Sequence, residues 1–169
     1  MIPESSLLMQ TENVSLENKI VKWIYGMKAR DVFYITRPRQ TESILNLPPN
    51  DEWLVQEYLP IDWEYKIAVV GYKALPVVVR FKTKQLGIEH ASAEVLASSQ
   101  LPAELILLAE KAARTLGREI TKVDIAEASG RWYVLEVNRN PGLQNFEKTS
   151  RYNAFRDIVG YVKARIVRF

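Results

Sequence analysis

The sequence predicts an α+β protein made of antiparallel hairpins and a few helices, and three observations lead to this fold class. Short runs of alternating or β-branched residues recur along the chain, and several are joined by glycine-containing turns, which is the pattern of β-hairpins. Apolar residues recur at helical spacing near residues 98–117 and again from about Asn153. The chain has 169 residues, 47% hydrophobic and 25% charged, which is enough to bury one core or a core divided between two lobes.

The sequence of residues 1–60 predicts a polar segment followed by a small lobe. Residues 1–16 show no periodic pattern, so no regular structure is expected there. Residues 17–60 are expected to form a small N-terminal lobe. Its predicted elements are a hairpin around Gly26, a short helix and a returning strand, which cover residues 20–35, 41–45 and 52–58.

Residues 61–169 predict a second, larger lobe. Its expected elements are a hairpin, a segment without a readable pattern, a helix, a second hairpin and a last helix, which cover residues 64–81, 82–95, 98–117, 121–138 and 153–166. The first helix is expected to begin at Ser98 or Ser99, with Pro102 in its first turn, and to end at Gly117. The last helix carries apolar residues at helical spacing, namely Phe155, Ile158, Val159, Val162 and Ile166.

The hairpin over residues 121–138 carries the polar side chains that most strongly indicate function. If its turn is centred near Gly130, Asp124 pairs with Glu136, and Asn138 lies on the same face because residues two apart on a strand share a face. Carboxylates that oppose each other across a ladder repel, and a hard divalent cation would relieve that repulsion. All three side chains offer oxygen, which favours Mg²⁺ or Mn²⁺ over Zn²⁺, and Mg²⁺ is commonly bound together with substrate phosphates.

Two alternatives stay open on spacing alone. An exposed hairpin can carry acids on its solvent face without any function. A shift of one residue in the turn would place Asp124 on the opposite face from Glu136, because the side-chain period of a strand is two.

These segments resemble the C-terminal signature of the ATP-grasp carboxylate–amine ligases, in particular the ribosomal-protein glutamate-adding ligases and the carrier ligases of lysine biosynthesis. The resemblance rests on residues 122–125, 133–143 and 146–149, and upstream on residues 19–22 with Gly26 and residues 54–59. It implies an ATP-grasp-like fold of two small lobes, each an antiparallel sheet with helices, with the nucleotide between them. It also implies that Asp124, Glu136 and Asn138 hold the Mg²⁺ ions that bridge the ATP phosphates.

Four further residues are candidates for binding the nucleotide. Lys22 ends an apolar strand four residues before Gly26, where its ammonium would reach the phosphates, although a strand-end lysine in solvent is the alternative. Lys28 would add positive charge to the loop over the phosphates. By resemblance, Glu57 lies next to the adenine. Glu64, preferred over Asp62, would accept hydrogen bonds from the ribose hydroxyls.

Two residues are candidates for catalysis. Arg80 ends the apolar run of residues 77–79, so its charge needs a partner, which is either a triphosphate or a structural carboxylate. Asn140 follows the metal residues directly and would orient an acyl phosphate, with Pro141 and Gly142 making the turn that presents it.

The resemblance implies an ATP- and Mg²⁺-dependent carboxylate–amine ligase, or its ATP-binding catalytic portion, that forms a peptide bond through an acyl-phosphate intermediate. Positioning and electrostatics would supply most of the acceleration, which suits a chain without cysteine. The alternative is a non-catalytic nucleotide-binding or interaction module derived from the same fold. The loop over residues 26–31 holds a single glycine, which restricts close backbone approach to phosphates.

Composition limits the compartment and the partners. No apolar run approaches the roughly 18 residues that cross a bilayer, and the first residues lack the pattern of a secretion signal, so a cytoplasmic protein without membrane contact is expected. The net charge of +3 comes from basic residues interleaved with acids, which disfavours nucleic-acid binding. The expected partners are ATP, an unidentified carboxylate substrate and an amine acceptor. A missing domain, a partner subunit and a homo-oligomer all stay open.

Overall fold

The computed structural model describes residues 1–3, 5–7, 16–24, 32–36, 53–83 and 90–166. The chain divides into two compact units, one formed by Met1–Ile2 with Ile61–Phe169 and the other by Pro3–Pro60. Met1 belongs to the larger unit because its carbonyl oxygen accepts a 2.8 Å hydrogen bond from the backbone N–H of Val134. Each unit is described by itself. Within the described ranges, no helix is long and apolar enough to cross a membrane.

The smaller unit contains an antiparallel sheet with the strand order β1-β4-β2-β3. Its strands are β1 (Ser5–Leu7), β2 (Lys19–Trp23), β3 (Val32–Ile35) and β4 (Trp53–Glu57). The predicted pairing of the strands around Gly26 and the returning third strand are confirmed. Strand β1 is a correction, since no regular structure was expected in residues 1–16, and three residues are too few to show a period. The helix predicted over residues 41–45 and the loop that contains Lys28 lie outside the described residues.

A small apolar core stabilises this unit. It is made by residues that alternate with more exposed ones along each strand, as expected for a sheet that buries one face. The buried members are Leu16, Val21, Ile35, Trp53 and Val55.

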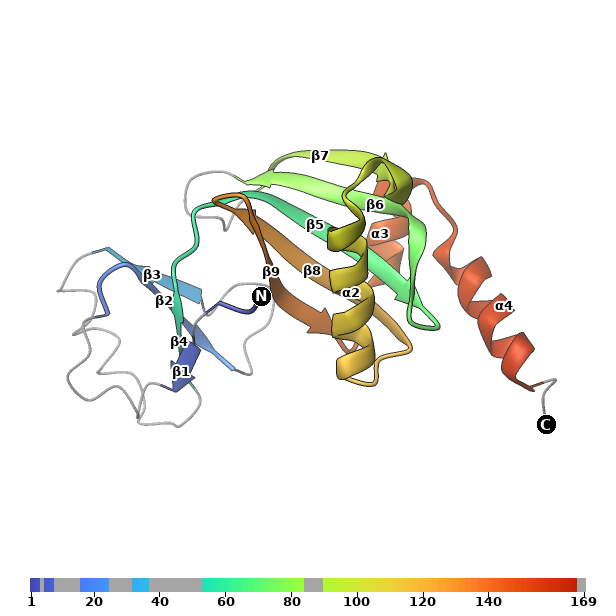
Figure 1. Cartoon of the computed structure of the whole chain (residues 1–169), viewed down its shortest axis with the longest axis horizontal. Coiled ribbons are helices and arrows are strands. Elements are labelled where there is room, and N and C mark those ends of the chain that lie inside the picture. The colour runs from blue at the N-terminus through green and yellow to red at the C-terminus, as the bar shows by residue number, and fades with distance from the viewer. Residues whose placement is uncertain (4, 8–15, 25–31, 37–52, 84–89, 167–169) are drawn as a thin grey trace. The chain divides into compact units, whose positions relative to one another are not determined.

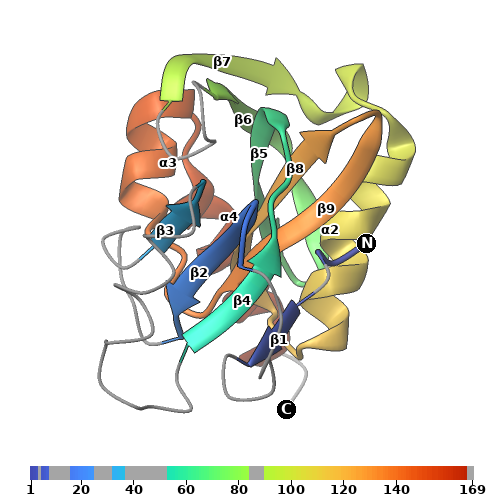
Figure 2. The same cartoon turned by 90° about the vertical axis from the view of Figure 1, so that its left-hand side faces the viewer.

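The larger unit is an antiparallel sheet with the order β7-β6-β5-β8-β9, covered by helices on both faces. Its strands are β5 (Ile61–Val70), β6 (Lys73–Thr83), β7 (His90–Ala97), β8 (Ile120–Ala128) and β9 (Arg131–Asn138). Its helices are the short 3₁₀ turn η2 (Ser98–Gln100) and the α-helices α2 (Ala103–Thr115), α3 (Leu143–Ser150) and α4 (Ala154–Ile166). Helix α2 lies on one face of the sheet and α3 on the other (Figures 1 and 2).

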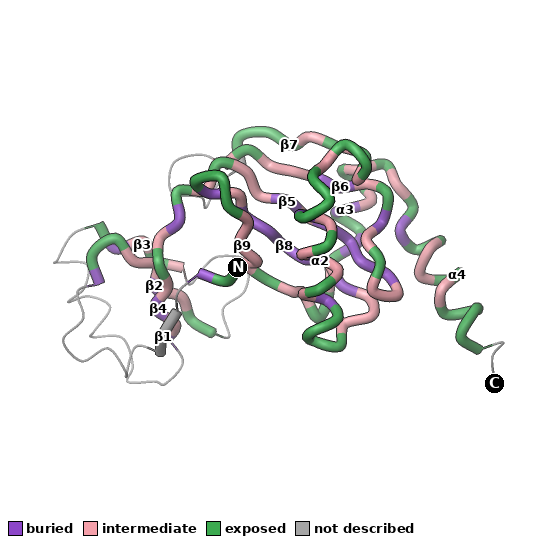
Figure 3. Tube along the Cα trace, viewed as in Figure 1, coloured by how far each residue is buried: buried purple, intermediate pink, exposed green. Residues whose placement is uncertain are grey.

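The two faces of this sheet carry different side chains. On β5, Ile67 and Val69 point toward α2 and belong to the main core, which also contains Leu105 of α2. The alternate residues Ala68 and Val70 point to the other face and pack with residues of α3 and α4. The central strands are the most buried part of this unit (Figure 3). Burying one such aliphatic side chain contributes about 1.5–3 kcal/mol, so the two clusters together hold the helices on the sheet.

Two short turns set the strand register. At the turn between β8 and β9, Ser129 and Gly130 have φ values of 50° and 71°. At the turn between β5 and β6, Gly71 and Tyr72 have φ values of 61° and 64°. Positive φ at both central residues is the geometry of the type I′ hairpin turn, whose twist matches the flanking strands. Each hairpin also contains a β-bulge, between Ile67 and Val69 and between Asp124 and Ile125, so the turn and the bulge together fix the register.

The helices differ from the prediction in two places. The helix expected from Ser98 begins at Ala103, because Pro102 disfavours a helical conformation at the preceding Leu101, which is extended with φ −103° and ψ 156°. Helix α3 was not predicted, since only Leu143 and Phe146 of its eight residues are buried. Most of β7 lies in the segment without a readable pattern, and β7 pairs with β6 at the edge of the described sheet.

The last helix begins where it was expected. Asn153 caps it, because its Oδ1 accepts a 2.9 Å hydrogen bond from the backbone N–H of Arg156. Ile158 and Tyr161 pack against the sheet. The other apolar residues at helical spacing are exposed, namely Phe155, Val159, Val162 and Ile166.

Truncating the core side of α2 should destabilise the protein far more than truncating its solvent side. Leu105 is 0% exposed and Leu107 is 60% exposed on the same helix. Leu105→Ala should lower the free energy of unfolding by about 2–5 kcal/mol, because it removes buried contacts and leaves a cavity. Leu107→Ala should change it by about 0.5 kcal/mol or less. Urea denaturation followed by circular dichroism measures both, and equal effects would contradict this packing.

Adding a methyl group at Gly71 should disturb the contact with α4. A Cβ at Gly71 would lie 2.6 Å from Cε2 of Tyr161, whereas a Cβ at Gly130 would meet nothing within 4 Å. Both positions have positive φ, so Gly→Ala at either site should cost about 1–2 kcal/mol in backbone strain. We expect Gly71→Ala to lower the melting temperature further than Gly130→Ala. In a Tyr161→Ala background the two substitutions should have equal effects, and a persisting difference would show that another contact is responsible.

Candidate functional site

A cluster of polar side chains lies on the face of the larger sheet that is covered by α3. In the strand register, Lys66 is opposite Asp124, Asp124 is opposite Glu136, and Lys122 is opposite Asn138. Residues directly opposite in neighbouring strands share a face, so all five belong to one surface. The predicted pairing of Asp124 with Glu136 is therefore confirmed, and the shifted register is excluded. The type I′ turn fixes the pairing as far as Ile125 with Val134, and a β-bulge between Asp124 and Ile125 then shifts the register by one residue, which brings Asp124 opposite Glu136.

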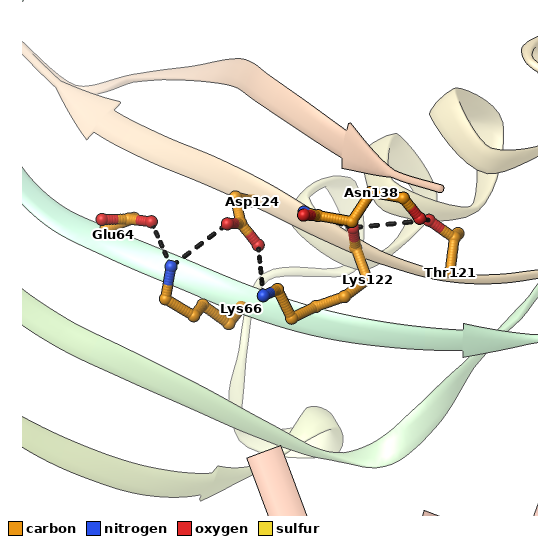
Figure 4. Close-up of polar contacts among 6 residues, drawn as sticks. All are labelled: Glu64, Lys66, Thr121, Lys122, Asp124 and Asn138. Carbon is orange, nitrogen blue, oxygen red and sulfur yellow. Dashed lines mark hydrogen bonds and ion pairs between the residues drawn. The ribbon is translucent and has the colours of Figure 1, made fainter. Parts of the chain in front are cut away.

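Asp124 is the most deeply buried member of the cluster, with 6% of its surface exposed. Its Oδ2 accepts a 3.1 Å hydrogen bond from Nζ of Lys66, which also donates to Oε1 of Glu64 at 2.5 Å. Its Oδ1 lies 3.8 Å from Nζ of Lys122 and has no hydrogen-bond partner among the described residues. Figure 4 shows Lys66 between the two carboxylates and Lys122 on the other side of Asp124. One oxygen of a buried carboxylate is thus left without a hydrogen bond.

Burial and neighbouring charges act in opposite directions on these groups. Burial raises the pKa of Asp124 above its ordinary value, because it disfavours the charged form, while Lys66 and Lys122 offset part of this effect. Burial alone would lower the pKa of Lys66, but the charges of Asp124 and Glu64 outweigh it and the pKa of Lys66 is raised. The ammonium form of Lys66 is therefore favoured, and its charge compensates the buried carboxylate.

Asn138 is held at the end of the hairpin by two hydrogen bonds. Its side-chain Nδ2 donates to the backbone carbonyl oxygen of Lys122 at 3.1 Å, and its backbone carbonyl oxygen accepts a 2.8 Å bond from Oγ1 of Thr121. The amide nitrogen is thereby engaged, so the amide oxygen is the atom that this side chain can offer to a cation.

The candidate ligand atoms are of the type that binds a hard divalent cation. The described residues contain no group of three or more histidine, cysteine, aspartate and glutamate side chains that could hold a metal. The candidate ligands are instead two carboxylates and one amide: Asp124, Glu136, which is exposed, and Asn138. All three donate oxygen, and oxygen ligands are those that Mg²⁺ takes. The unpartnered Oδ1 of Asp124 is the atom that such an ion would satisfy first.

A pocket of about 280 Å³ adjoins the cluster, between the sheet and α3. The sheet contributes two ammonium groups and two apolar side chains, and α3 contributes polar groups and one aromatic ring. The lining residues are Lys66, Val79, Phe81, Lys122, Gly142, Asn145, Phe146 and Thr149. Gly142 precedes α3 with φ +55°, a conformation that favours glycine. The pocket therefore combines positive charge with apolar surface, which suits an anion with an apolar portion.

The structure does not bring Arg80 to this cluster. Arg80 is opposite Tyr65 in the register and so lies on the α2 face of the sheet, away from Asp124. Its guanidinium donates to Oε2 of Glu94 at 2.9 and 2.7 Å and lies 4.1 Å from the ring centroid of Trp63. Of the two partners left open by the sequence, the structure therefore shows the structural carboxylate. The catalytic assignment of Arg80 has no geometric support here.

The remaining predicted residues are distributed over both units. Glu64 belongs to the cluster through its hydrogen bond with Lys66. Asn140 is exposed in the segment between β9 and α3. Lys22 is half-buried on β2, and Glu57 is exposed at the end of β4, both in the smaller unit. Their proposed roles in nucleotide binding stay predictions, as does the role of Lys28.

Lys66 and Lys122 belong to the cluster but were not among the predicted site residues. Lys122 lies two residues before Asp124, so the period of a strand would have placed both on one face. Lys66 had no such local signal, because it is 58 residues from Asp124 in the sequence and the two meet only through the pairing of β5 with β8.

The family model of the RimK-like ATP-grasp domain matches residues 7–162. This chain belongs to the RimK-like ATP-grasp family. It is 27% identical over 151 residues to a probable alpha-L-glutamate ligase of Serratia proteamaculans (strain 568), covering 86% of this chain and 50% of that protein. It is also 27% identical over 151 residues to the ribosomal protein bS6–L-glutamate ligase of Escherichia coli O81 (strain ED1a), covering 85% of this chain and 50% of the relative. The chain thus spans about half the length of these curated relatives.

Solved structures support the same fold. The ATP-grasp ligase PsnB, in complex with a phosphomimetic variant of its minimal precursor, Mg and ADP, superposes with a TM-score of 0.72 at 16% sequence identity, covering 98% of this chain and 54% of PsnB. At this identity the similarity shows the fold alone. The expectation of an α+β, ATP-grasp-like architecture with antiparallel sheets is confirmed.

Removing the ammonium of Lys66 should destabilise the folded chain. In Lys66→Met the Oδ2 of Asp124 loses its hydrogen bond inside the protein. We expect a loss of roughly 1.5–3 kcal/mol in the free energy of unfolding, the range for a hydrogen bond to a charged group. Adding Asp124→Asn should recover part of the loss, because it removes the uncompensated charge. Lys111→Met, an exposed position on α2, is the control. Chemical denaturation measures the three variants and the wild type, and a Lys66→Met variant as stable as the control would contradict the pairing.

Proposed function

We propose that this chain is an ATP- and Mg²⁺-dependent carboxylate–amine ligase, or the ATP-binding catalytic portion of one, that forms a peptide bond through an acyl phosphate. The observation that carries the proposal is the unpartnered Oδ1 of Asp124 on the same sheet face as Glu136 and Asn138, in a chain of the RimK-like ATP-grasp family. The relatives named as glutamate ligases support this reaction class. The complex of PsnB with Mg and ADP supports the cofactors.

Some site residues of this chain would bind the metal, and others compensate charge or orient the ligands. Mg²⁺ held by Asp124, Glu136 and Asn138 would neutralise the triphosphate and stabilise charge at the γ-phosphorus. Lys66 compensates the buried charge of Asp124 and keeps that carboxylate in one position through its hydrogen bond. Asn138 is oriented by its bond to the carbonyl oxygen of Lys122. Fixed dipoles and charges of this kind accelerate a reaction because they need no reorganisation when charge develops.

The pocket beside the cluster provides a place for the carboxylate substrate. Lys122 on the sheet and Asn145 and Thr149 on α3 offer hydrogen-bond donors, while Phe81 and Phe146 exclude water. We propose an amino acid or a peptide carboxylate as the acid and an amino group of a peptide or protein as the acceptor. The name of the relative ribosomal protein bS6–L-glutamate ligase and the complex of PsnB with a variant of its minimal precursor support these substrate classes. A cytoplasmic location, where ATP is abundant, remains part of this proposal.

A second candidate function is a nucleotide-binding or interaction module without turnover. Two observations favour it. The β6 residues that line the pocket are Val79 and Phe81, so this strand presents no cation there. The chain also spans about half the length of the relatives it matches. The ligase proposal therefore includes a catalytic group supplied by another segment or subunit, whereas a binding module without turnover needs no such group.

Titration with a non-hydrolysable ATP analogue tests the nucleotide site. The wild-type chain should bind the analogue in the presence of Mg²⁺, and the double variant Asp124→Asn/Glu136→Gln should bind at least about tenfold more weakly, which corresponds to about 1.4 kcal/mol. Glu104→Gln, an exposed acid on the opposite side of the sheet, removes one charge elsewhere in the same unit and should bind like the wild type. Isothermal titration calorimetry with and without Mg²⁺ measures the affinities.

Release of ADP then separates the two candidate functions. An enzyme should release ADP from ATP when an acid such as glutamate and an amine acceptor are both present, and the double variant should not. Binding without ADP release across a panel of acids and amines would favour the non-catalytic module. Binding that is equal in the wild type and the double variant would contradict the proposed metal ligands.

A further inference from the structure

Lys122 occupies an unusual position for a lysine. Lysine side chains normally keep their ammonium in water, yet the side chain of Lys122 is only 16% exposed. It stands on β8 opposite Asn138, on the sheet face that carries Asp124 and lines the pocket. Its Nζ lies 3.8 Å from Oδ1 of Asp124, the same oxygen that lacks a hydrogen bond (Figure 4). The ammonium therefore stands beside the atom that a cation would take first.

The contact between Lys122 and Asp124 is weaker than the contacts of Lys66. Lys66 is held by two hydrogen bonds, of 2.5 Å to Glu64 and 3.1 Å to Asp124. A separation of 3.8 Å is an ion pair but too long for a hydrogen bond. Lys66 is thus fixed between two carboxylates, whereas Lys122 is attracted to Oδ1 without donating a hydrogen bond to it. Of the two lysines, Lys122 is the one that an incoming ion would displace at the lower cost.

The charges on this face are nearly balanced by the protein itself. The acids are Glu64, Asp124 and Glu136, and the bases are Lys66 and Lys122, so one negative charge remains in excess. Without Lys122 the excess would be two. A divalent ion binds more tightly as the number of uncompensated negative ligands rises, because its attraction is mainly electrostatic. The charge of Lys122 therefore reduces the attraction of this face for a free metal ion.

We propose that Lys122 is an internal counter-cation that competes with divalent metal for Oδ1 of Asp124 and so sets the metal affinity of the site. The inference rests on the metal role of Asp124 proposed above. Mg²⁺ binds oxygen at about 2.0–2.1 Å, so an ion on Oδ1 would repel an ammonium a few ångströms away. The pocket offers that ammonium a polar alternative, because Lys122 lines it together with Asn145 and Thr149. Metal uptake and movement of Lys122 toward the pocket are then coupled.

Binding of Mn²⁺ to the nucleotide-free protein tests this inference directly. Free Mn²⁺ is measured by electron paramagnetic resonance in the wild type and in Lys122→Met. A unit charge about 4 Å away contributes about 1 kcal/mol even at the dielectric constant of water, so Lys122→Met should bind Mn²⁺ at least about fivefold more tightly. Lys122→Arg keeps the charge and should stay within about twofold of the wild type, on the same electrostatic argument.

Three further variants serve as controls for the Mn²⁺ measurement. Lys111→Met removes a positive charge from α2, on the other face of the sheet, and should leave the Mn²⁺ affinity unchanged. Lys122→Gln is a second neutral variant, which replaces Lys122→Met if that protein does not fold. Asp124→Asn in the Lys122→Met background should lose the gain, because the added affinity depends on Oδ1 of Asp124.

The outcomes separate this inference from the proposed ligase activity. Tighter Mn²⁺ binding in both neutral variants, lost with Asp124→Asn, supports the counter-cation. Unchanged or weaker binding in the neutral variants, or an equal gain in Lys111→Met, overturns it. Because no nucleotide is present, an absence of ATP binding or ADP release would count against the proposed function alone.

Discussion

The hydrogen bond from Lys66 to Asp124 is the interaction on which the site depends. A carboxylate with 6% exposure is costly to bury unless positive charge lies next to it. Lys66 supplies that charge from the central strand β5, and it also binds Glu64, so two carboxylates are ordered by one ammonium. The bond also joins two hairpins that are distant in sequence. Structural stability and the geometry of the site therefore rest on the same pair of atoms.

The antiparallel sheet explains how one strand can serve both the core and the site. Successive residues of β8 point to opposite faces, so Val123 and Ile125 fill the core under α2 while Asp124 faces α3. This arrangement places a charged group between two of the most buried apolar residues in the chain. A change of one residue in the register of β9 would exchange the two faces, and the β-bulge between Asp124 and Ile125 is what places Glu136 opposite Asp124.

A feature of the structure could be predicted from the sequence where it depends on residues that are close together in the chain. The pairing of Asp124 with Glu136 was predictable to within one residue from the turn between alternating strands, and the β-bulge between Asp124 and Ile125, which alternation alone does not indicate, completes it. The position of Arg80 was not, because its partner Glu94 lies on β7, an edge strand in a segment without a readable pattern. Helix α3 escaped prediction because it buries only Leu143 and Phe146. Lys122 was predictable, because it lies two residues before Asp124 on the same strand and so shares its face.

The strand order β7-β6-β5-β8-β9 has a consequence for the order in which the molecule folds. The hairpins β5–β6 and β8–β9 are closed by two-residue turns, so each is a local event on the microsecond scale. Pairing of β5 with β8 instead requires closure of a long intervening chain, which is entropically costly and slows folding. That late step is also the one that brings Lys66 to Asp124. The charge cluster is thus a product of the long-range pairing, and a chain arrested before it would carry intact hairpins and no site.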